Sequence, residues 1–156
     1  EGMYDFYLAV AESDLEAFGI PFAEMVERRM NMKPCVTLRD IVPGTAKYET
    51  MAETLETRCN GKVVFVLSKN FNNSEECQFL VQFAKTLDPY AKQQKLIPLV
   101  IDKNVKLPRV LEGLVCINYN AALRENWLGR RLWEAVHGGT DRHARHRRRT
   151  LSSPYS

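Results

Sequence analysis

The stretch KVVFVLS (residues 62–68), followed shortly by SEECQFLVQFAKTL (residues 74–87), decides the fold of this chain. The first stretch is apolar without alternation, which is typical of a strand covered on both faces. The second repeats apolar residues at helical spacing, and Ser74 before two glutamates favours a helix N-terminus. A fully buried strand followed by an amphipathic helix indicates an α/β domain.

Four further apolar runs flank this unit, at residues 4–10, 35–38, 96–101 and 114–119. Amphipathic segments of helix length separate them, so the sequence predicts five parallel strands joined by right-handed helical crossovers. Ser13 and Glu16 have the spacing of a capping box, and Pro21 is suited to the first turn of a regular helix. Pro98 lacks a ladder donor, so we expect the fourth strand to be short or bulged there.

Length and composition point to one globular domain with a basic end. The chain has 156 residues, 45% of them hydrophobic and 26% charged, and no apolar run reaches the roughly 18 residues of a membrane span. Its net charge is +3, but residues 138–156 hold five arginines and one aspartate, which leaves −1 for residues 1–137. We expect a folded domain over 1–137, a flexible Arg-rich tail over 138–156, and no nucleic-acid binding by the folded part.

The cysteines and histidines give no support to a metal site. Four cysteines stand at positions 35, 59, 77 and 116 without a CxxC pair, and three histidines stand at 137, 143 and 146. Such unpaired thiols on apolar segments favour packing roles in a reducing, cytoplasmic setting. Phosphate-binding glycine motifs are also lacking. We therefore expect no cofactor and no metal.

The loop after the second predicted strand is the clearest candidate site. It contains Arg39, Asp40, Ile41, Val42, Pro43, Gly44 and Thr45. Proline followed by glycine suits the centre of a type II turn, and Thr45 can cap the next helix. Ile41 and Val42 in such a loop suggest a contact surface. An ordinary turn with Ile41 folded inward is the alternative, and the residues alone leave both open.

Three short motifs together resemble a Toll/interleukin-1 receptor (TIR) domain over about residues 4–137. They are Tyr4-Asp5-Phe6-Tyr7, Arg39-Asp40-x-x-Pro43-Gly44 and, half present, Asn126-Trp127. The Leu-Ile-Pro98 sequence of the fourth strand is also similar to the family, which removes the objection to Pro98. The resemblance implies a flavodoxin-like five-stranded parallel sheet of order 2-1-3-4-5 with helices on both faces.

The resemblance also implies a non-enzymatic, cytoplasmic signalling module of innate immunity and the inflammatory response. Its partners would be the TIR domains of Toll-like and interleukin-1 receptors and of adaptors. It would also self-associate, with higher-order assemblies as one outcome, and it would reach a membrane only indirectly through receptors. Two segments, around the Arg39 loop and around Cys77, most resemble adaptor members. The cytoplasmic domain of a Toll-like receptor stays open.

Some TIR domains cleave the nicotinamide–ribose bond of NAD, which requires a carboxylate beside the developing positive charge. The resemblance places Leu80 where those enzymes have that glutamate, and Glu76 lies one helical turn earlier. We therefore expect no catalytic residues, with an NAD glycohydrolase as the alternative.

Two further residues and the tail are weaker candidates. Arg58, at the end of the helix after the loop, and Trp127, in the last helix, are candidate partner contacts. Because Trp127 and Trp133 are six residues apart, one is expected to pack and the other to be partly exposed. The tail could be functionally silent, bind anionic lipid or act as a nuclear-import patch.

Overall fold

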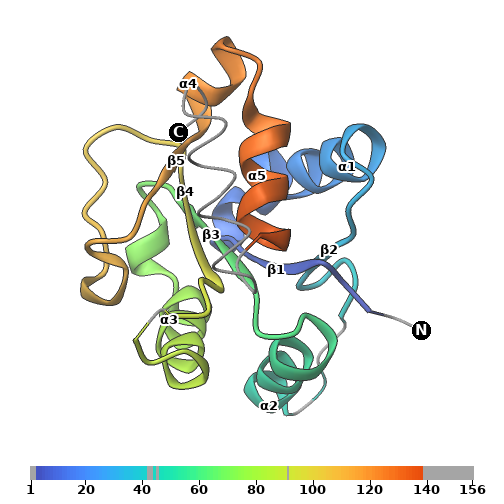
Figure 1. Ribbon diagram of the computed structural model, residues 1–156. Helices are drawn as coiled ribbons and strands as arrows, with labels where there is room; N and C mark the ends of the chain where they lie inside the picture. The colour runs from blue at the N-terminus through green and yellow to red at the C-terminus, as the bar shows by residue number, and fades with distance from the viewer. Residues whose placement is uncertain (1–2, 42–43, 45, 91, 139–156) are drawn as a thin grey trace.

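The computed structural model describes residues 3–41, 44, 46–90 and 92–138. Its centre is one parallel sheet in the order β2-β1-β3-β4-β5, which confirms the predicted topology (Figure 1). The strands are β1 (Phe6–Ala9), β2 (Pro34–Val36), β3 (Val63–Leu67), β4 (Leu96–Val100) and β5 (Ile117–Asn118). β2 and β5 form the two edges of the sheet. The outer strands are shorter than the apolar runs that predict them.

Helices cover both faces of the sheet. The α-helices are α1 (Ile20–Arg29), α2 (Lys47–Glu53), α3 (Glu75–Leu87), α4 (Tyr119–Arg124) and α5 (Leu128–His137). The segments Leu15–Gly19 and Thr54–Arg58 are π-helical turns that adjoin α1 and α2. Single 3-10 turns occur at Glu12–Asp14, Phe71–Asn73 and Arg109–Leu111.

Two apolar cores lie on opposite faces of the sheet. Tyr7, Phe65 and Leu67 point to the face that α2 and α3 cover, whereas Leu8 and Val66 point to the face covered by α1, α4 and α5. Successive side chains of a strand alternate between faces, so a strand with a core on each side must be apolar throughout. All five residues of β3 are buried, which is why this segment shows no alternation.

The helix starts agree with sequence expectation in two places and differ in one. Ser74 Oγ accepts a hydrogen bond from Cys77 N at 3.2 Å, which caps α3, and Pro21 lies in the first turn of α1. The capping box predicted at Ser13 is wrong, because a 3-10 turn followed by a π-helical turn occupies this segment without side-chain capping. Asp14 is instead bonded to the β3–α3 connection, accepting from Ser68 Oγ and from Asn70 Nδ2 at 3.0 Å.

Pro98 lies within a regular β4, so the expected shortening or bulge is wrong. It pairs in register with Phe65. The odd-numbered residues of this region direct their backbone N–H and C=O groups toward β3. Lys95 O accepts a hydrogen bond from Val63 N, and Ile101 N donates one to Leu67 O. Pro98 therefore faces the other side, where pairing with β5 begins only at Leu99. No donor of the ladder is lost.

The end of α5 is fastened to the sheet by side chains from the strands' amino ends. Lys62, just before β3, donates from its buried Nζ to Val136 O, and burial lowers the pKa of this lysine. His137 Nε2 lies 3.5 Å from Asp5 Oδ1. Among the described residues, no helix has the length and apolar character needed to cross a bilayer. The predicted tail, apart from Gly138, lies outside the described residues.

Candidate functional site

Arg39 and Asp40 form a braced root for the loop that follows β2. Asp40 Oδ2 accepts from Val36 N at 2.8 Å and from Arg39 Nη2 at 3.0 Å. The same guanidinium reaches Glu27 Oε2 on α1 at 2.6 Å and Pro34 O at 3.3 Å. Burial by itself lowers the pKa of Arg39, but its hydrogen bonds to Asp40 and Glu27 raise it overall. These two residues therefore fix the base of the loop.

Ile41 is buried, and Leu38 is the apolar side chain that this loop exposes. Ile41 is 6% exposed and packs in the core beneath α2 and α3, so the inward alternative describes it correctly. Leu38, in the turn before it, is 54% exposed and has φ 77°. Leu38 N donates to Ile41 O at 2.8 Å, which closes the turn. A residue with a β-carbon is disfavoured at this φ, so the backbone of the turn is locally strained at Leu38 while its apolar side chain is exposed.

The rest of the predicted loop is described only at Gly44. This glycine is exposed, and a β-carbon built on it would have nothing within 4 Å. Val42, Pro43 and Thr45 lie outside the described residues. α2 begins at Lys47 without a side-chain cap.

A cleft of about 430 Å³ opens beside this loop, where β1 and β3 end. Its polar lining comes from Glu12, Ser13, Lys47, Tyr48, Asn70, Asn73, Ser74, Glu75 and Glu76. The connections that follow β1 and β3 lead to helices on opposite faces of the sheet, and open parallel sheets bind ligands at such a switch point. Leu80 is 2% exposed and belongs to the core below, so no carboxylate occupies its position.

The charged groups of the cleft are bonded to one another. Lys47 Nζ lies 2.8 Å from Glu76 Oε2. Glu76 also shares a hydrogen bond with Glu12. This hydrogen bond and the repulsion between the two carboxylates raise the pKa of Glu12. The hydrogen bond between Lys47 and Glu76 likewise raises the pKa of Lys47. The arrangement can hold a proton between two carboxylates next to an ammonium group.

Arg58 and Trp127 are far from each other and engaged within their own chain. The Arg58 guanidinium lies 4.9 Å from the ring centre of Tyr4, on the α2 side. Trp127 Nε1, at the start of α5, donates to Glu125 Oε1 at 2.7 Å. Both side chains are half-buried, whereas Trp133 is 46% exposed. The predicted difference between the two tryptophans is therefore confirmed, and Trp133 is the one that solvent reaches.

Sequence reasoning missed Leu38, Glu12 and Lys47. A signal for the first two is present in the sequence, because Leu38 ends a predicted strand and Glu12 lies two residues beyond another, where sites in parallel sheets gather. The signal for Lys47 is weaker, since it depends on where α2 begins after the loop.

Comparison with known proteins agrees with this architecture. The family model described as TIR domain matches residues 6–133. The TIR domain of the Toll-related receptor TRR-2 from Hydra magnipapillata superposes with a TM-score of 0.69 at 20% identity, covering 86% of this chain and 98% of that one. A prokaryotic SEFIR domain superposes with a TM-score of 0.60 at 13% identity, covering 85% and 91%. At these identities the two solved structures support the fold alone. The family model matches most of the sequence, so the chain belongs to the TIR domain family.

Proposed function

We propose that this TIR domain is a non-enzymatic signalling adaptor module that binds the TIR domains of Toll-like or interleukin-1 receptors and of other adaptors. The observation that carries the proposal is the loop after β2, whose root is braced by Arg39 and Asp40 while Leu38 is held outward. A contact surface that is already ordered loses little conformational entropy when a partner docks.

The adaptor assignment rests on the sequence around the loop and α3. Cys35-Val36-x-x-Arg39-Asp40-x-x-Pro43-Gly44-Thr45 and Lys69-x-x-x-x-Ser74-x-Glu76-Cys77 are similar to the myeloid differentiation primary-response adaptor. In that protein a death domain precedes the TIR domain in the cytoplasm. The residues upstream of Glu1 test this assignment: a death domain supports it, and a membrane span contradicts it.

Higher-order assembly is also proposed, because two unlike surfaces lie at opposite edges of the sheet. The braced loop follows edge strand β2. A groove of about 270 Å³ lies at edge strand β5, where Val115 is 79% exposed. When one copy's loop meets another copy's groove, the pair still has one free loop and one free groove, so such contacts propagate head to tail.

The proposal is tested by replacing Pro43 with glutamine, using Pro89→Gln in the exposed turn after α3 as the matched control. Binding to receptor TIR domains is measured by calorimetry, and self-association by sedimentation velocity. We expect Pro43→Gln to abolish binding with an unchanged circular dichroism melt, because proline followed by glycine favours a turn that glutamine does not preset. Unaltered partner affinity in that variant contradicts a role for the loop. A Val115→Lys variant that leaves self-association intact contradicts the head-to-tail arrangement.

An NAD glycohydrolase is the second candidate, and the carboxylate pair in the cleft favours it. A glutamate with a raised pKa beside a second carboxylate is a pattern of acid–base catalysis. Glu76 is, however, already bound by Lys47, and Leu80 lies in the core. Incubation with NAD distinguishes the two: we expect no release of nicotinamide, and release that disappears in a Glu76→Gln variant would establish the enzyme.

A further inference from the structure

The start of α2 lacks the residues that stabilise a helix N-terminus. α2 begins at Lys47, and its N-cap residue Ala46 offers no side-chain hydrogen bond to the first N–H groups. A lysine in the first turn is also unfavourable, because the N-terminus of a helix carries partial positive charge. A residue that contradicts local preference in this way calls for a tertiary reason. The contacts of the Lys47 side chain supply one.

The first turn of α2 is joined to α3 through side chains. Lys47 Nζ lies 2.8 Å from Oε2 of Glu76, whose side chain is only 13% exposed, and 5.3 Å from the ring centre of Tyr48. Tyr48 packs on Phe79 of α3 with 4.8 Å between ring centres. Figure 1 shows α2 and α3 next to each other. An ion pair and an aromatic contact therefore connect the beginning of α2 to the neighbouring helix.

Glu76 lies on a helix whose own start is fixed. Ser74 caps α3, and a carboxylate in the first turn is favoured by the same dipole that disfavours Lys47 in α2. The low exposure of Glu76 reduces the screening of the ion pair by solvent. Glu12, in the connection after β1, shares a hydrogen bond with Glu76. Without the ammonium group these two carboxylates face each other, so the loss of Lys47 costs more than the loss of an ordinary surface ion pair.

We propose that the Lys47–Glu76 ion pair is a clamp that fixes the far end of the loop after β2, as Arg39 and Asp40 fix its root. The root is connected to α1, because Arg39 Nη2 lies 2.6 Å from Glu27 Oε2. The far end is connected to α3 through Glu76. Helices α1 and α3 cover opposite faces of the sheet. The loop is thus positioned from both faces of the sheet at once.

The clamp gives Glu76 a positioning role in place of a catalytic one. Its consequence for partner binding rests on the proposed function: a loop fixed at both ends loses less conformational entropy when a TIR domain docks on it. The clamp itself is a property of the single chain and is measured without a partner. The inference and the proposed function can therefore fail separately.

The test is a charge reversal and a charge swap in the full chain, followed by amide hydrogen exchange. Thr50 N donates to Ala46 O at 3.0 Å, so the exchange rate of the Thr50 amide, measured by NMR, reports the order of the first turn of α2. We expect Lys47→Glu to accelerate this exchange at least about fivefold, because three carboxylates then meet. The swap, Lys47→Glu with Glu76→Lys, is expected to return the rate to within about twofold of the parent protein.

Lys85→Glu is the matched control. Lys85 is exposed in the last turn of α3, so this reversal changes the net charge equally and should leave the Thr50 rate unaltered. A milder variant, Lys47→Met, should give a smaller acceleration of the same amide, while slow exchange in β3 shows that each variant remains folded. Calorimetric titration with a receptor TIR domain should follow the same order: Lys47→Glu weakens binding at least about fivefold and the swap restores it. A catalytic role of Glu76 is not restored by the swap, because lysine cannot replace the carboxylate.

Three results overturn the clamp. They are an unchanged Thr50 rate in Lys47→Glu, an equal acceleration in Lys85→Glu, and a swap that exchanges as fast as the single reversal. Full affinity in Lys47→Glu with accelerated exchange, while Pro43→Gln abolishes binding, removes the clamp from the TIR contact and leaves the proposed function intact. Full affinity in both variants contradicts the proposed function instead, and an accelerated Thr50 amide then still supports the clamp.

Discussion

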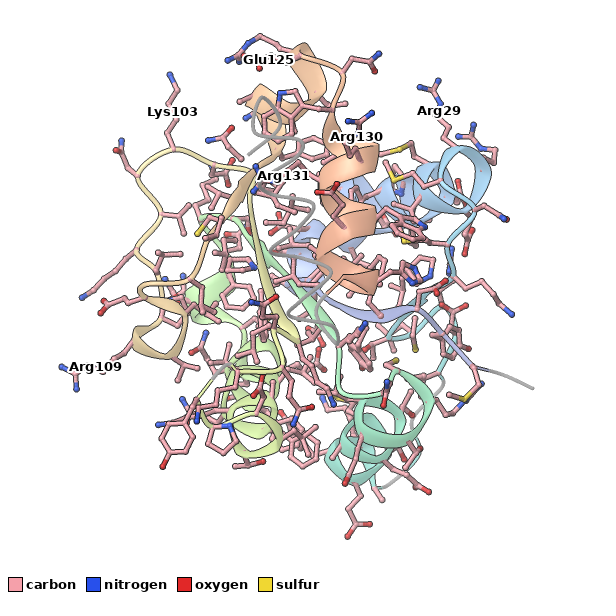
Figure 2. All side chains as sticks on the ribbon, viewed as in Figure 1. Arg29, Lys103, Arg109, Glu125, Arg130 and Arg131 are labelled. Atoms are coloured by element: carbon pink, nitrogen blue, oxygen red, sulfur yellow. The ribbon has the colours of Figure 1, made fainter. Side chains whose placement is uncertain are left out.

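The two helical layers use their charged side chains differently. Beside α2 and α3, Lys47, Glu76 and Glu12 are bonded to one another within a cleft. On the other face of the sheet, Arg29 at the end of α1 projects into solvent (Figure 2). Charges bonded in a cleft fix local geometry at short range, whereas exposed charges contribute little to stability and act on a partner at a distance. The cleft is therefore suited to shaping a contact at short range, whereas an exposed charge such as Arg29 acts on a partner only at a distance.

The largest expected effect concerns Leu80, which lies in the core below the cleft and not at the surface of the cleft. We expect Leu80→Glu to destabilise the fold by about 3–5 kcal/mol, because it buries an unpaired charge. Leu80→Ala should cost about 2–5 kcal/mol through the cavity it leaves. Urea unfolding followed by circular dichroism measures both. A glutamate variant as stable as the parent protein would place this side chain at the cleft surface.

Asp40 tests the distinction between bonded and exposed charges directly. Asp40→Ala removes the acceptor of Val36 N and the partner of Arg39, so we expect a loss of about 1–3 kcal/mol in unfolding free energy. Arg29→Ala, an exposed charge in the other layer, should change it by less than about 0.5 kcal/mol. Equal costs for the two substitutions, measured by the same denaturant titration, would remove the difference between the layers.

A substitution at Leu38, in the turn after β2, tests whether fold stability and partner binding change in opposite directions. Its φ of 77° suits glycine, so we expect Leu38→Gly to stabilise the fold by up to about 1 kcal/mol. The same change removes the exposed apolar side chain and should weaken TIR association. Thermal unfolding and calorimetric titration are run on the same sample. A variant that gains stability and keeps full affinity would show that Leu38 is not a contact residue.

Glu12 gives the smallest expected effect. Its folded pKa is raised above the usual 4.5 by Glu76, so in the interval just above that value the folded state binds more protons than the unfolded state. Stability contributed by this group is thus present at lower pH and declines slightly as pH rises through the interval. Glu12→Gln should flatten that slope in acid-range denaturation profiles. A Glu112→Gln control should leave it unchanged.

Most of the sheet is predictable from the sequence, because its central strand is buried on both faces. Residues 63–67 and 75–87 carry unambiguous patterns, and alternating strands and helices predict a parallel sheet, whereas the strand order is predicted only by the resemblance to TIR domains. The edges are harder, since β5 keeps only two residues of a six-residue apolar run. The segment before α1 was not predictable, because Asp14 exchanges a local cap for bonds to Ser68 and Asn70, residues distant in the sequence.

The candidate site is predictable in place but not in detail. Proline, glycine and the Arg39-Asp40 pair identify the loop. Which apolar residue faces solvent depends on the positive φ of Leu38, a conformation that propensity disfavours and that the Leu38 N to Ile41 O hydrogen bond accompanies.

The fastening of α5 by Lys62 and Asp5 determines how the molecule would carry mechanical load. A pull on the chain beyond His137 enters the fold where the helix is joined to the central strands. Tension applied at the end of α5 is thus shared with β1 and β3 as shear, instead of peeling α5 away one turn at a time.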